Sequence, residues 1–169
     1  MENPRFAVVD VETTGGRPGC ARIIEIGIVL VDDWKVTQHF ESFIKTSEEL
    51  SPFIQNLTGI TPKKLDNAPT FDEIARKVAK LLDGRIFVAH NVASDYSAVA
   101  SEMKRSGLDF SPERLCTVKL SRKVFPGLPK YSLHDLTLSL GLPDFESHRA
   151  LNDAVAAARI LLLAQERFG

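Results

Sequence analysis

Two acidic residues close the first apolar segment of the sequence. Asp10 and Glu12 follow the run RFAVV, and side chains two positions apart on a strand lie on the same face. With a rise of about 3.3 Å per residue, their Cα atoms would lie about 6.6 Å apart. A divalent cation between them would relieve the repulsion of two partly buried negative charges. The pair predicts a metal site, and the alternative is a strand that simply ends in polar residues.

Two aspartates in the first turns of predicted helices could complete such a site. Asp153 lies near the start of the predicted helix 149–167 and points about 200° away from Leu151, toward a second apolar stripe. An unpaired carboxylate should avoid such a stripe, which favours a functional role. Asp95 lies in the first turn of the predicted helix 92–105. The alternative for both is a surface aspartate that complements the helix dipole.

One of the four histidines is placed to act as a general base. His148 lies in the loop that opens the last helix, five residues before Asp153. From there its ring can reach a site that the aspartate anchors, and its reference pKa of about 6.5 suits proton abstraction near neutral pH. A histidine beside four carboxylates suggests activation of water while metal ions hold a phosphate. His90 is predicted to be a buried structural residue, and His39 and His134 to be structural or surface residues.

The elements that must position these residues follow from hydrophobic periodicity and helix caps. Three strands come first, and helices then alternate with strands, which predicts one α/β domain over residues 1–169 with a mixed sheet. The expected strands are 5–11, 22–32, 35–44, 86–89 and 116–119. The expected helices are 51–57, 70–83, 92–105, 132–140 and 149–167.

The bulk composition suits a single globular domain and excludes several classes of protein. The 169 residues are 44% hydrophobic, and 21 Lys and Arg against 22 Asp and Glu give a net charge of −1, which argues against a generic basic binder of polyanions. The N-terminus does not read as a secretory signal, and we find no apolar run of about 20 residues that would predict a membrane span. Cys20 and Cys116 are predicted to be reduced thiols, and the protein to be cytoplasmic.

Three motifs in order along the chain resemble the DnaQ-like DEDD 3′–5′ exonucleases of the histidine subclass. They are DVETTG at 10–15, HNVASD at 90–95 and HRALND at 148–153. LTGIT at 57–61 and the segment 119–142 are similar to the family as well, so the resemblance covers nearly the whole chain. The likeness extends to the proofreading epsilon subunit of bacterial DNA polymerase III and to related exonuclease domains. The resemblance implies an RNase H-like fold with a five-stranded mixed sheet in the order 3-2-1-4-5.

The resemblance also implies two Mg²⁺ or Mn²⁺ ions and a role for each candidate residue. Asp10 would bridge both ions, with Glu12 and Asp153 completing the site of the attacking water. Asp95 would serve the second ion through water, and His148 would take the proton from the attacking water. Oxygen ligands suit such hard cations.

By family position, five further residues would contact the nucleotide. Thr13 and Thr14 would approach the terminal nucleotide, Leu57 and Ile60 would wedge against the last bases, and Asn91 would lie where the strand enters. The alternatives are a turn for the threonines, core positions for the two apolar residues, and a helix cap for the asparagine.

The expected substrate is a single-stranded or frayed DNA 3′ end, from which nucleoside monophosphates are released. Two alternatives stay open: an exoribonuclease that trims RNA ends or short oligonucleotides, and a non-catalytic module that binds nucleic acid or a polymerase. A DNA polymerase subunit is the expected protein partner. The sequence stops at Gly169 without a polymerase-binding tail, so we expect a free-standing exonuclease or the catalytic domain of a longer protein. A basic group could track the strand or simply be solvated: Lys119, Arg122, Lys123, Lys130 and Arg149.

Overall fold

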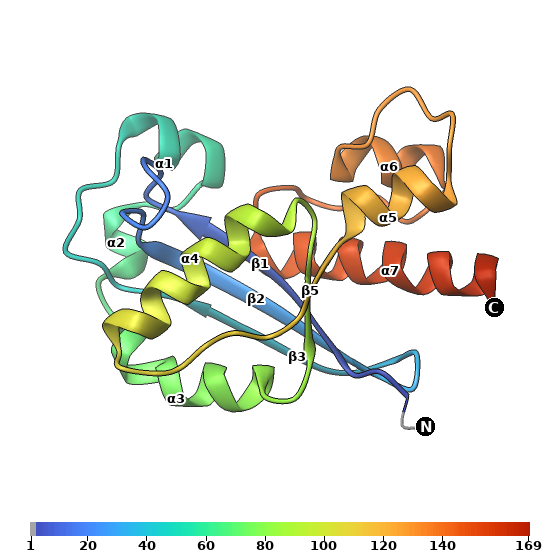
Figure 1. Cartoon of the computed structure of the whole chain (residues 1–169). Coiled ribbons are helices and arrows are strands. Elements are labelled where there is room, and N and C mark those ends of the chain that lie inside the picture. The colour runs from blue at the N-terminus through green and yellow to red at the C-terminus, as the bar shows by residue number, and fades with distance from the viewer. Residues whose placement is uncertain (1–2) are drawn as a thin grey trace.

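The computed structural model describes residues 3–169, which form a five-stranded mixed sheet covered by helices on both faces (Figure 1). The strand order is β3-β2-β1-β4-β5, as predicted. β1 runs antiparallel to β2 and parallel to β4, and β5 runs parallel to β4. The strands are β1 (Phe6–Thr13), β2 (Ile23–Asp32), β3 (Lys35–Phe43), β4 (Ile86–Ala89) and β5 (Arg114–Cys116).

Seven helices are found in the described residues, and most of them match the predicted spans to within one or two positions. Thr70 begins the third helix with a reciprocal capping box, in which its side chain accepts from the Glu73 N–H and Glu73 accepts from the Thr70 N–H. The helices are α1 (Pro52–Thr58), α2 (Pro62–Leu65), α3 (Phe71–Leu82), α4 (Val92–Arg105), α5 (Thr117–Val124), α6 (Leu133–Ser139) and α7 (Ala150–Phe168).

Alternation along β1 divides the core into two layers. Ala7 and Val9 face α3 and α4, where they pack in one cluster with Phe71 and Val99. Phe6, Val8 and their neighbours on β2 face α7 in a second cluster. Asp10 and Glu12 continue the α7 face toward the C-terminal end of the strand. The long helix α7 is therefore the element that lies over these carboxylates.

One sequence prediction about local structure was wrong, and one short helix was missed. The predicted strand 116–119 is a three-residue strand that ends at Cys116, and α5 begins directly after it. Thr117, Ser121 and Val124 are buried with helical spacing, and this packing overrides the strand preference of Thr and Val. The short helix α2 was not predicted. None of the helices within residues 3–169 combines the length and apolar character that a membrane span requires.

Candidate active site

Asp10 and Glu12 lie on the same face of β1, near the C-terminal end of the strand. Within the antiparallel pair with β2, Asp10 is opposite Gly27 and Glu12 is opposite Glu25. Asp10 Oδ2 is buried and has no hydrogen-bond partner among the described residues. Glu12 is 9% exposed. A buried carboxylate oxygen without a donor is costly, so the site fits an electrophilic ligand that the protein itself does not supply.

Asp95 reaches the same place from the other face of the sheet. β4 ends at Ala89, so the N–H of Val11 lies beyond the last residue of its parallel neighbour. Asp95 Oδ1 accepts this N–H at 3.0 Å, and the residue is 7% exposed. The early end of β4 thus makes room for α4 to bring a third carboxylate to the end of β1.

Asp153 and His148 are brought together at the start of α7. Asp153 Oδ2 accepts the backbone N–H of His148 at 3.2 Å, while Asp153 Oδ1 is buried and has no partner within residues 3–169. His148 has a φ of +63° and an exposed side chain. One ligand atom each from Glu12, His148 and Asp153 lies within 4.8 Å of the others. This geometry fits a cation held between β1 and α7.

The carboxylates of the site resist ionisation when they face one another without a cation. Burial raises the pKa of Glu12 to about 8, and the charges of Asp153, Glu25 and Asp95 add to the effect. Burial likewise raises the pKa of Asp95 to about 7 and that of Asp153 to about 6. Burial, followed by the charges of Asp95 and Asp153, raises the pKa of Asp10 well above its usual value. Oxygen donors crowded in this way suit a hard divalent cation, which stabilises all of the ionised forms.

Three of the residues expected to contact the nucleotide border this cluster. Thr13 Oγ1 accepts the N–H of Gly15 at 3.1 Å, and Thr14 Oγ1 accepts the N–H of Arg22 at 3.0 Å. The two threonines therefore shape the turn after β1. Asn91 is exposed and begins α4 in the left-handed region with φ +64°, and its side chain forms no cap hydrogen bond in the described chain.

The two apolar residues of the LTGIT segment are placed differently. Leu57 is on α1 and is 39% exposed. Ile54 of the same helix lies close to Gly15 in the turn after β1. Ile60 is 1% exposed and packs in the core beside Ile24. The structure thus places Ile60 at the core position that was its alternative, with almost no surface to offer a nucleotide.

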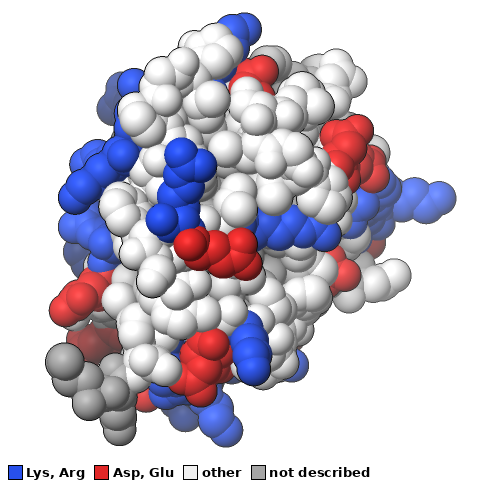
Figure 2. Space-filling model, turned by 90° about the vertical axis from the view of Figure 1, so that its right-hand side faces the viewer, with Lys and Arg blue, Asp and Glu red and all other residues white. Residues whose placement is uncertain are grey.

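The basic residues considered as a track for the strand differ in their contacts. Lys119, Lys123 and Lys130 are exposed around α5. Arg122 stacks on the ring of Tyr131 at 5.0 Å, and Arg149 forms an ion pair with Glu25. Figure 2 shows the face at the right of Figure 1, where Lys and Arg gather along one edge but acidic side chains are interspersed.

His90 has a structural place, as predicted. Its Nδ1 pairs with Thr117 Oγ1 at 2.8 Å and its Nε2 with the Tyr131 carbonyl at 2.9 Å. Burial lowers the pKa of His90, which favours the neutral ring. The ring joins β4 to the chain after α5.

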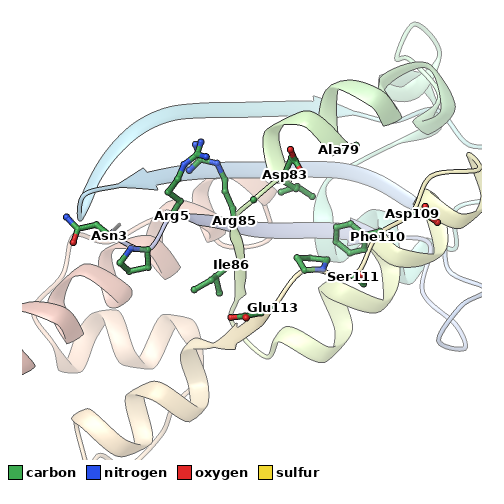
Figure 3. A pocket seen from close by; sticks show the side chains of 14 residues that line it. Asn3, Arg5, Ala79, Asp83, Arg85, Ile86, Asp109, Phe110, Ser111 and Glu113 are labelled. Carbon is green, nitrogen blue, oxygen red and sulfur yellow. The ribbon is translucent and has the colours of Figure 1, made fainter. Parts of the chain in front are cut away.

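A hollow of about 650 Å³ lies at the opposite end of the sheet, near the starts of β1 and β4 (Figure 3). Figure 3 shows Arg5 and Arg85 beside one another above it. Both guanidinium groups pair with Asp32, at 3.1 Å and 2.9 Å. Hydrogen bonds from Arg85, Thr37 and Arg5 lower the pKa of Asp32 to about 2. Both arginines of the hollow therefore already have a carboxylate partner.

Sequence reasoning missed one charged residue beside the site. Glu25 is 3% exposed near the start of β2, and its carboxylate accepts hydrogen bonds from the N–H of Ala150 and the Nε–H of Arg149. The signal was a single charge inside the otherwise apolar run IIEIGIVLV.

Residues 7–161 match the family model of the RNase_T exonucleases. The chain belongs to this exonuclease family. It is 40% identical to a protein named 3′-5′ exonuclease DinG from Staphylococcus saprophyticus, over 99% of this chain and 19% of that protein. It is 38% identical to the protein of the same name from Bacillus subtilis, over 99% of this chain and 18% of that protein. The chain thus spans about a fifth of the length of these relatives.

Solved structures of exonucleases have the same fold. Exonuclease X in complex with 5′ overhanging duplex DNA superposes with a TM-score of 0.75 and 26% identity, over 95% of this chain and 91% of that chain. E. coli Exonuclease I in complex with a dA16 oligonucleotide superposes with a TM-score of 0.84, over 98% of this chain and 41% of that chain. The latter is 20% identical, so it supports the fold alone. The RNase H-like fold predicted from the sequence is confirmed.

Proposed function

We propose that this exonuclease domain uses two divalent metal ions to remove nucleoside monophosphates from the 3′ ends of single-stranded or frayed DNA. The observation that carries the proposal is the convergence of four carboxylates at the end of β1. Two of them, Asp10 and Asp153, have a buried oxygen without a partner within residues 3–169. The names of the relatives support the 3′–5′ direction, and the Exonuclease X complex supports DNA as the substrate.

The residues present fit a pair of Mg²⁺ or Mn²⁺ ions. Asp10, Glu12 and Asp153 would hold one ion, and Asp10 and Asp95 the second. Such ions, when bound, would lower the pKa of water and stabilise the negative charge on the phosphate. The protein contributes the all-oxygen donor set and the buried setting in which those charges act strongly.

His148 is the proposed general base. Its backbone N–H is held by Asp153, which leaves the exposed ring free to face solvent and substrate. From this position the ring can accept a proton from the attacking water and pass it to bulk solvent.

The terminal nucleotide is proposed to lie over the turn after β1. Thr13 and Thr14 offer the backbone of this turn to the 3′-hydroxyl, Leu57 contacts the last bases, and Asn91 lies where the strand enters. An apolar contact with the face of a base is tolerant of sequence because every base has such a face, as a trimming enzyme requires. A proofreading role with a polymerase partner follows from the resemblance, and co-purification with a bacterial replicative polymerase would test it.

The test compares single strands of DNA and RNA of one sequence, labelled at either end, with Mg²⁺ or Mn²⁺. The expected result is a ladder that shortens from the 3′ end of the DNA, with nucleoside monophosphates as products. If RNA were trimmed faster than DNA, the substrate would be assigned as RNA instead of DNA. Binding without any release of nucleotides would favour a non-catalytic module.

A further inference from the structure

Glu25 is a fifth carboxylate at the site, and the proposed mechanism assigns it no task. It lies on β2 directly opposite Glu12 in the antiparallel register and is 3% exposed. Two like charges placed opposite one another in a sheet are destabilising. A residue that remains buried under this penalty must form contacts that repay it.

Both oxygens of Glu25 are engaged with the start of α7. Oε1 accepts the N–H of Ala150, the first residue of the helix, and Oε2 accepts the Nε of Arg149 at 3.3 Å. The first N–H groups of a helix lack partners within the helix, and a carboxylate there also complements the helix dipole. Arg149 occupies the N-cap position and supplies no capping side chain of its own in the described chain. Glu25 therefore caps α7 from a strand 125 residues away in sequence.

Gly27 brings the same turn of α7 directly onto β2. A Cβ atom at Gly27 would lie 2.4 Å from the backbone nitrogen of Leu151, so no side chain fits between the strand and the helix. Gly27 and Glu25 point to one face of β2, since they are two positions apart. β2 thus contacts the first turn of α7 through Glu25 and Gly27, which lie opposite Glu12 and Asp10 of β1.

The turn that Glu25 holds also carries the second half of the active site. Asp153 belongs to this turn, and it accepts the backbone N–H of His148. The separation between the carboxylates of β1 and the Asp153–His148 pair therefore depends on how α7 sits on β2.

We propose that Glu25 is a positioning residue, whose carboxylate clamps the first turn of α7 to β2 and so holds Asp153 and His148 at their working distance from Asp10 and Glu12. The inference rests on the proposed function. Glu25 acts through α7, because both of its oxygens accept N–H groups at the start of that helix.

The test compares Glu25→Ala and Glu25→Gln with a matched control, Glu102→Gln. Glu102 is also a buried carboxylate, 1% exposed, and it accepts Arg22 Nε at 2.7 Å and the N–H of Ile23 at 3.4 Å, away from the ligands. Glu25→Ala is expected to lower kcat about 10- to 100-fold, the usual cost of removing a partner that orients ligands, with little change in KM for a DNA strand. Glu25→Gln keeps an oxygen that can accept the Ala150 N–H, so it should recover most of kcat. Glu102→Gln should keep the wild-type kcat.

A second readout does not depend on activity. In metal-free protein, the amide hydrogens of Ala150 and His148 should exchange faster in Glu25→Ala than in wild type, and at wild-type rates in Glu25→Gln and Glu102→Gln. Wild-type kcat and exchange rates in Glu25→Ala would overturn the proposal. So would a Glu25→Gln variant as impaired as Glu25→Ala, because the charge rather than the clamp would then matter. If wild-type protein cleaved no substrate, the proposed function would fail, while amide exchange would still decide the clamp.

Discussion

The carboxylate cluster makes the stability of the metal-free protein depend on pH in an unusual direction. Glu12, Asp95 and Asp153 have raised pKa values in the folded protein, so the folded state holds their protons more tightly than the unfolded chain does. The free energy of unfolding is not reduced by these groups below their unfolded pKa values near 4, because they are protonated in both states. Stability is lost progressively as the pH rises from there, and the loss is complete once the pH has passed the folded values of about 6 to 8.

The size of the loss follows from Glu12, which has the highest folded pKa of these three groups. Its pKa rises from 4.5 to about 8, and each pH unit between these values costs about 1.4 kcal/mol of stability. From pH 5 to pH 8 the single group thus removes about 4 kcal/mol, an appreciable part of the roughly 5–15 kcal/mol of a typical domain. The contributions of the neighbouring carboxylates are not added to this figure, because the ionisation of each group changes the pKa of the others.

The assay is urea unfolding in the presence of a chelator, followed by circular dichroism at pH 5, 6, 7 and 8. The free energy of unfolding should fall across this series, and Mg²⁺ or Mn²⁺ should restore it at pH 8. Glu12→Gln should reduce the slope and be more stable than wild type at pH 8 without metal. Glu146→Gln, which removes an exposed acid, should follow the wild-type curve. A metal-free stability that stays level or rises from pH 5 to pH 8 would refute the reasoning.

Three substitutions test the remaining assignments. Asp10→Asn should abolish nucleotide release while the metal-free protein becomes harder to unfold by urea, and retained hydrolysis would remove Asp10 from the site. His148→Ala should lower kcat about 100-fold or more, as for a general base, with little change in Mn²⁺ affinity measured by calorimetry, and an unchanged kcat would contradict its role. Leu57→Ala should raise KM for oligonucleotides but leave hydrolysis of the nitrophenyl ester of thymidine monophosphate unchanged. Phe168→Ala truncates a side chain that is 67% exposed at the far end of α7, and it should change neither the KM for oligonucleotides nor the hydrolysis of the nitrophenyl ester. Equal effects of Leu57→Ala and Phe168→Ala on KM would count against the Leu57 contact.

Local patterns were enough to place most of the catalytic candidates. Strand alternation set Asp10 and Glu12 on one face, and helical periodicity set Asp153 among buried residues, because both signals depend only on neighbouring positions. The same kind of signal failed at Thr117, where a β-branched residue at the end of a short strand begins a helix. There the burial of Thr117, Ser121 and Val124 on one side of α5 outweighs local preference.

Features that depend on distant segments were not accessible from the sequence. The role proposed for Glu25 depends on its hydrogen bond from the N–H of Ala150. No pattern among neighbouring residues predicts a contact between these two positions. Ile60 was placed at the nucleotide by family position, whereas packing against Ile24 buries it. The raised pKa values likewise exist only once α4 and α7 bring Asp95 and Asp153 to the end of β1.

The central claim is that the carboxylates at the end of β1 bind two catalytic ions. Titration of the wild-type protein with Mn²⁺ in the presence of thymidine monophosphate, followed by electron paramagnetic resonance, counts these ions directly. The account predicts two bound ions per chain in wild type and a loss of tight binding in Asp10→Asn. Wild-type protein that binds no Mn²⁺, or Asp10→Asn that binds as many ions as wild type, would contradict it.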